Sequence, residues 1–219
     1  ANDVALVESI VSQRLKGSIL WMVVGLLTTL GIGIATLMNP SWARFAASNF
    51  NILLIAEVAV VFLFSMRTYK ANAMFFIYSA LNGVTLSLVS LAYGIMEATV
   101  PALIGALAFF VAFSIVGLTT KKNLAGLTPY LVAAIFGMII VSLVFMAASY
   151  FSIPYLSSIS YSTISLILGY IGVVVFSIFT AVDMNMIKNS VTQLALSEDE
   201  TILDRIEIAG ALSLYLDFI

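Results

Sequence analysis

Long apolar stretches separated by short polar ones dominate the chain. A membrane core about 30 Å thick needs about 20 apolar residues in a helix. The pattern therefore predicts an all-α integral membrane protein, with a seven-transmembrane-helix bundle in a single domain over residues 19–219 and a polar, cytoplasmic tail over residues 1–18. The approximate predicted spans are 19–38, 50–66, 74–96, 100–118, 130–151, 160–187 and 202–219.

The last apolar stretch is shorter than the others. It begins near Ile206 and reaches Ile219 after about 14 residues, which is short for a span. We expect this seventh helix to be truncated. Ser197-Glu198-Asp199-Glu200 precedes it and predicts a capping box at its start.

Prolines and glycines add local detail. Pro101 and Pro129 stand where a first helical turn is predicted, with Thr128 placed as a cap. Gly169 and Gly172 predict close helix packing in the 160–187 span, because small residues let two backbones approach.

The composition supports a membrane protein and argues against several classes of function. Hydrophobic residues make up 62% of the chain and charged residues 9%, whereas soluble domains are near half apolar and a quarter charged. The net charge of −2 gives no basic surface for nucleic acid. The chain has no His and no Cys, so we expect neither an enzyme nor a bound cofactor. Carboxylates are therefore the side chains left for proton transfer or ion binding, and their oxygen atoms suit calcium and protons.

Positive charges predict the orientation. Eight of the nine lie in the tail or in every second connection, and Arg44 lies on the other side. Because cytoplasmic loops carry the excess of Lys and Arg, we expect these eight to face the cytoplasm. They are Arg14, Lys16, Arg67, Lys70, Lys121, Lys122, Lys188 and Arg205.

Three acidic residues fall inside the apolar part of a predicted span, where a charge is costly: Glu57, Asp183 and Asp217. Asp204 and Glu207 precede the apolar part of the last span. Consecutive antiparallel helices are usually neighbours, so Asp183 and Asp217 are candidates to meet in the cytoplasmic half. Two such carboxylates would share a proton and titrate together, which predicts a pH sensor and a calcium site. Alternatively, Asp183 is an interfacial residue paired with Lys188 or Arg67, and Asp217 is a neutral acid used in packing.

Other polar positions have two interpretations each. Arg67 is an anchor in the headgroups or a latch on the aspartate pair. Glu57 is a protonated acid bonded to a neighbouring helix or a carboxylate on an ion path. The third span carries small and polar residues on one face, which favours close packing over a polar path through Asn82. That face holds Ser79, Asn82, Gly83, Ser87 and Ser90.

Several segments together resemble a known family, the transmembrane BAX inhibitor motif proteins in their bacterial branch. The resemblance covers the chain from the first span onward, and Gly210–Ile219 is its most specific segment. The other segments are Ser65-Met66-Arg67, Tyr78–Leu86, Thr119–Leu124 and Asp183–Asn189.

The resemblance implies a seven-helix bundle with a central helix wrapped by the others. It implies that Asp183 and Asp217 form a pH-sensing pair and that Arg67 latches against it. Glu57 matches an acidic position of some members. Bacterial members are associated with pH-dependent calcium leak, and some relatives instead bind a membrane-anchored protease.

Two functions remain open at this stage. One is a pH-dependent calcium leak channel or transporter gated by the aspartate pair. The other is a non-transporting regulator that binds a membrane protein through a tail segment, Val4–Val11. The sequence does not predict the oligomeric state.

Overall fold

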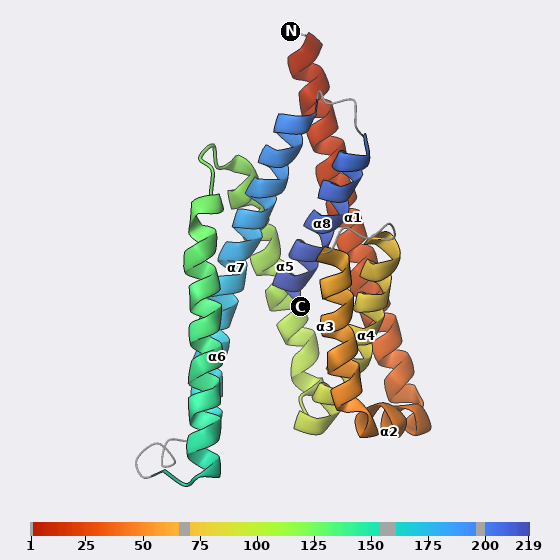
Figure 1. Cartoon of the computed structure of the whole chain (residues 1–219), viewed down its shortest axis with the longest axis vertical. Helices are drawn as coiled ribbons and strands as arrows, with labels where there is room; N and C mark the ends of the chain where they lie inside the picture. Colours follow the sequence, from red (N-terminus) through yellow and green to blue (C-terminus); the bar gives the residue numbers. More distant parts are fainter. Residues whose placement is uncertain (1, 66–70, 154–160, 196–199) are drawn as a thin grey trace. The chain divides into compact units, whose positions relative to one another are not determined.

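The computed structural model describes residues 2–65, 71–153, 161–195 and 200–219, and these are almost entirely helical (Figure 1). The helices are α1 (Asn2–Met38), α2 (Pro40–Ser48), α3 (Phe50–Ser65), α4 (Ala71–Tyr93), α5 (Met96–Thr119), the 3-10 turn η1 (Ala125–Leu127), α6 (Thr128–Tyr150), α7 (Tyr161–Leu194) and α8 (Glu200–Phe218). The prediction of an all-α protein is therefore confirmed.

Five of these helices are long and apolar enough to cross a membrane: α1, α4, α5, α6 and α7. A sixth span results if α2 and α3, which are bent by 77° at Asn49, are counted as one. α8 falls outside this set, since it carries charges at Glu200, Asp204, Arg205, Glu207 and Asp217. Seven spans therefore stay a prediction.

The helix boundaries differ from the predicted ones at informative places. α1 runs without a break through residues 2–18, so the predicted tail is helical and continuous with the first span. α5 begins at Met96, which puts Pro101 inside the helix rather than in its first turn. Pro129 does lie in the first turn of α6, but Thr128 is a helical residue and Leu127 is the N-cap, without a side-chain bond. The predicted capping box lies outside the described residues, apart from Glu200.

The chain divides into two compact units. Unit 1 comprises residues 1–105, 187–217 and 219, and unit 2 comprises residues 106–186 and 218. Helices α5 and α7 contribute to both, as does α8 through Phe218.

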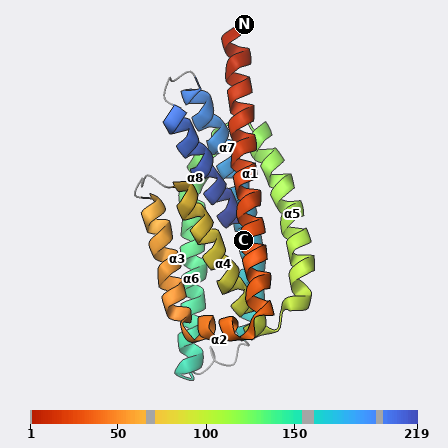
Figure 2. The ribbon, with the colours of Figure 1, turned by 90° about the vertical axis from the view of Figure 1, so that its right-hand side faces the viewer.

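In unit 1, α1 packs along α4, and α3 packs on α4 as well. The close approach of α1 and α4 depends on Gly83, because a Cβ there would lie 2.5 Å from the carbonyl oxygen of Thr29. The packing interpretation of the Gly83 face is thereby supported. α2 lies across the ends of these helices (Figure 2), and its buried Ala43 and Ala46 pack on Val84 and Leu88 of α4.

In unit 2, α6 packs against α7 around Leu131, Val175 and Val182. α5 meets α7 at Gly117, where an added Cβ would overlap the carbonyl oxygen of Ala181. Gly169 and Gly172 behave differently, since a Cβ at either would meet none of the described residues within 4 Å. The prediction that these two glycines mark a packed helix face is wrong for the described part of the chain.

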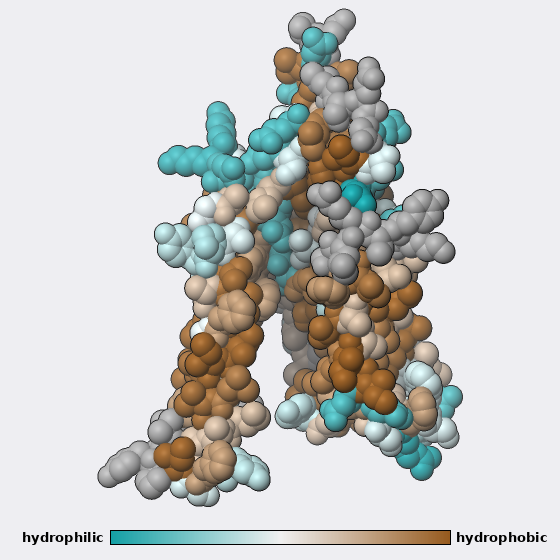
Figure 3. All heavy atoms as spheres, viewed as in Figure 1, coloured by the Kyte–Doolittle hydropathy of each residue, from teal (hydrophilic) through white to brown (hydrophobic). Residues whose placement is uncertain are grey.

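Large apolar side chains cover the outside of both units. Ile55, Val58 and Phe62 of α3 and Phe136 and Ile140 of α6 are all more than half exposed. Figure 3 shows the resulting apolar surface over α3 and α6. A soluble protein rarely exposes so large an apolar area, whereas lipid tails solvate it well. The protein is a multi-pass membrane protein.

Gly117, at a helix contact, and Gly169, beside open space, give a matched test of the packing of α5 on α7. We expect Gly117→Ala to destabilise the protein by about 1–3 kcal/mol, because the Ala181 backbone must shift. Gly169→Ala adds a methyl group in open space and should leave stability unchanged or raise it slightly. Thermal unfolding in detergent measures both, and equal midpoints for the two variants would contradict the packing.

Candidate functional site

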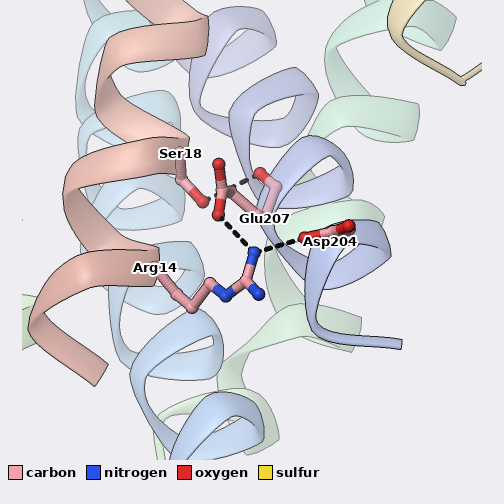
Figure 4. A network of polar contacts seen from close by, with 4 residues as sticks. All are labelled: Arg14, Ser18, Asp204 and Glu207. Carbon is pink, nitrogen blue, oxygen red and sulfur yellow. Dashed lines mark hydrogen bonds and ion pairs between the residues drawn. The ribbon is translucent and has the colours of Figure 1, made fainter. Parts of the chain in front are cut away.

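An ion-pair cluster joins the first and last helices of unit 1 (Figure 4). Arg14 of α1 donates hydrogen bonds to Asp204 and, at 3.1 Å, to Glu207 of α8. Ser18, one turn after Arg14, is fully buried and donates to the main-chain oxygen of Glu207 at 2.8 Å. The cluster thus binds two side chains and a main-chain oxygen of α8 to α1.

Two glycines make this approach possible. A Cβ at Gly17 would overlap the carboxylate of Glu207, and a Cβ at Gly210 would lie 2.6 Å from Ile187 Cδ1 and 3.2 Å from Ser18 Oγ. A side chain at position 17 would displace the carboxylate of Glu207, and one at position 210 would displace the end of the Ile187 side chain. In the sequence Arg14 stands out only as one of the orientation charges, and no motif there indicates this cluster.

A second polar group of unit 1 is buried among α1, α4 and α8. Thr29 Oγ1 lies 2.6 Å from the hydroxyl of Tyr215, and its single proton is shared between the main-chain oxygens of Ser79 and Gly25, at 2.8 and 3.0 Å. Tyr215 is fully buried, with Phe75 and Tyr78 packed edge-on against its ring. Buried hydroxyls need such partners, so this group fixes how α8 faces α1 and α4.

Polar side chains continue from there across α4 to α3. Asn82 is buried and interacts with Tyr78 and Tyr215. Its Nδ2 atom has no hydrogen-bond acceptor among the described residues. One turn further, Thr85 donates to the carboxylate of Glu57, which is half-buried in α3. Glu57 of α3 therefore contacts α4 one turn from Asn82, so the two predicted path residues lie near each other.

The two predicted sensor residues lie in different units. Asp217 is half-buried in the last turn of α8 in unit 1, two residues after Tyr215. Asp183 is half-buried in α7 in unit 2, between the fully buried Val182 and Met184. Their pairing stays a prediction, as does a calcium site on them. Arg67, the predicted latch, lies outside the described residues.

Asn185 organises the unit 2 segment around Asp183. It is fully buried, and the two hydrogens of its Nδ2 atom are shared among the main-chain oxygens of Gly117, Thr120 and Lys122, each 3.2 Å from the nitrogen. Its Oδ1 atom accepts from the backbone N–H of Leu124 at 2.9 Å. One amide side chain thus ties the end of α5 and the following turn to α7, two residues from Asp183. In the sequence Asn185 stands out only as part of the segment Asp183–Asn189 that carries the family resemblance.

Carboxylates do not gather into a metal cage in the described part of the chain. No group of three or more acidic side chains there is placed to hold a metal ion. Calcium prefers six to eight oxygen ligands, so a firmly held ion would need carbonyl oxygens and water besides the carboxylates.

Comparison with known proteins gives a consistent result. The family model described as "Inhibitor of apoptosis-promoting Bax1" matches residues 11–219. The inner membrane protein YbhL of Escherichia coli is 34% identical over 207 residues, which cover 91% of this chain and 83% of that protein. An uncharacterised protein of Deinococcus radiodurans is 32% identical over 204 residues, covering 91% of this chain and 82% of that protein. An uncharacterised membrane protein of Streptococcus pyogenes is 35% identical over 191 residues, covering 85% and 73%.

The cluster at Arg14 predicts a specific stability effect. Arg14 is largely buried, with 16% of its side chain exposed, whereas its partner Asp204 is 68% exposed. We expect Arg14→Gln to cost about 1–2 kcal/mol, because a charged hydrogen bond to Glu207 is lost and the exposed pair adds little.

Lys16→Gln serves as the matched control, since Lys16 is exposed on the same helix. Denaturation in detergent should show the loss for Arg14→Gln only, and the loss should shrink at high salt, which screens charges. Equal stabilities of the two variants would show that the cluster does not hold α8 in place.

Proposed function

This chain belongs to the Bax inhibitor family, and we propose that it is a pH-dependent calcium leak channel or transporter of the bacterial cytoplasmic membrane. The observation that carries the proposal is the position of three carboxylates within apolar stretches of the sequence. Glu57, Asp183 and Asp217 are each half-buried, in α3, α7 and α8. Acidic groups at such positions are costly and commonly mark ion or proton pathways.

In the proposed mechanism Asp183 and Asp217 form the gate. Two carboxylates in a poorly solvated site share a proton, so at low pH they join their helices in a closed state. Loss of that proton makes the two groups repel, and release of Arg67 then opens the cytoplasmic half. The calcium flux should therefore rise as the pH rises through the titration of the pair.

The polar side chains of unit 1 are the proposed path beyond the gate. Glu57, Thr85 and Asn82 supply hard oxygen atoms on neighbouring turns of α3 and α4. An ion that is to leave again must be bound weakly and at successive places. Scattered carboxylates favour such a leak over a storage site.

The experiment is calcium flux into proteoliposomes over a pH series. We expect the flux of the unsubstituted protein to increase from acidic to neutral pH. Asp217→Asn and Asp183→Asn imitate the protonated form and should hold the flux low at every pH. Glu57→Gln should lower the flux and keep its pH dependence.

Glu8→Gln is the control, because Glu8 is an exposed acid at the N-terminal end of α1. It should leak like the unsubstituted protein. A flux in Asp217→Asn whose pH dependence is unchanged would refute the sensor. No flux at any pH would refute the leak itself.

A second candidate function is a regulator that binds a membrane-anchored protease or another membrane protein. The observation that favours it is the N-terminal part of α1, where Val4 and Leu6 are 64% and 51% exposed. Exposed apolar residues on a helix end are a common recognition element for a partner protein.

Deleting residues 1–9 distinguishes the two functions. This deletion removes Val4 and Leu6 but retains Arg14 and Ser18, so the contacts between α1 and α8 are kept. A leak protein should keep its calcium flux after the deletion. A regulator should lose its effect on a membrane-anchored protease in the same vesicles, measured as the rate of substrate cleavage. Lost flux with intact folding would contradict the leak proposal in its present form.

A further inference from the structure

A cavity of about 760 Å³ lies where the end of α1, helix α2, the start of α3 and the end of α4 come together in unit 1. Its wall includes Leu37, Phe50, Leu88 and Leu91. The charged residue in this otherwise apolar wall is Arg44 of α2. A volume of this size is in the range of pockets that bind organic ligands.

Helix α2 has the features of a helix that lies in the membrane surface. It is amphipathic and bends away from α3 by 77°. Its buried Ala43 and Ala46 face the core, whereas Trp42 and Phe45 are exposed, with their rings stacked 5.6 Å apart. Aromatic side chains concentrate at the level of lipid headgroups, which places the cavity beside that level.

Arg44 is oriented by its own helix. Its Nε atom donates to the main-chain oxygen of Pro40 at 3.2 Å. Within the described residues no acidic side chain forms an ion pair with Arg44. A guanidinium held in this way presents its terminal N–H groups to an outside anion, and a phosphate accepts from two of them at once.

We propose that this cavity binds an anionic phospholipid, with the phosphate on Arg44 and part of an acyl chain between Leu37, Phe50 and Leu91. The charge of Arg44 selects the anionic headgroup, and the apolar wall accommodates the chain. Lipid is the expected occupant because exposed apolar residues of α3, Ile52 and Ile55, continue the surface next to Phe50. This site is independent of the calcium pathway.

Trp42 reports on lipids near this site. The chain has two tryptophans, so Trp21→Phe leaves Trp42 of α2 as the one tryptophan of the protein. The protein is reconstituted in phosphatidylcholine with increasing fractions of brominated phosphatidylglycerol. A second series uses brominated phosphatidylcholine mixed with unbrominated phosphatidylglycerol. Bromine quenches a nearby tryptophan. We expect the anionic lipid to bind about fivefold better than phosphatidylcholine, as for one basic residue at a membrane surface.

Three variants test the parts of the site. Arg44→Gln should abolish the preference. Arg44→Lys keeps the charge but loses the paired hydrogen bonds, so it should keep part of the preference, which also shows that position 44 tolerates change. Ala92→Phe fills the cavity from α4 and should weaken the preference. Lys121→Gln removes an exposed charge elsewhere and should change nothing.

Several results would overturn the proposal. Equal quenching by both lipids would do so, as would a full preference in Arg44→Gln or in Ala92→Phe. Inorganic phosphate should not compete with the lipid. If phosphate abolishes the preference, the site binds free phosphate and the acyl chain plays no part.

Discussion

Hydrocarbon offers no hydrogen bonds, and the rest of this structure depends on that constraint. Backbone groups must be paired within each segment, so the described residues are almost entirely helical. Several side-chain polar groups are paired within the protein as well: Thr29 with Tyr215, Thr85 with Glu57, and Asn185 with four backbone groups. The apolar residues that a soluble protein buries are on the outside instead.

The helices were predictable from the sequence because hydropathy is a local signal that needs no knowledge of packing. Helix α2 was not predicted, since nine residues with Trp42, Arg44 and Phe45 resemble a connection as much as an interfacial helix. The glycines show the same limit. Gly117 meets a neighbouring backbone and Gly169 meets open space, yet nothing in the adjacent sequence distinguishes them.

The candidate site was predictable only where a polar residue interrupts an apolar run. Glu57, Asn82, Asp183 and Asp217 were found in this way. The pair of Arg14 and Glu207 was not, because its members are 193 positions apart and each lies in a polar segment where a charge is ordinary. Gly17 and Gly210, whose size permits that pair, were a usable signal only once α1 and α8 were known to touch.

The central claim of the proposed function is that Asp183 and Asp217 form a proton-sharing gate. The most direct measurement is the distance between their carboxylate oxygens in structures of the protein at acidic and at neutral pH. The account predicts a hydrogen-bonded pair, about 2.5–3.0 Å apart, at acidic pH and separated carboxylates at neutral pH. Carboxylates that are far apart at both pH values, or equally close at both, would contradict it.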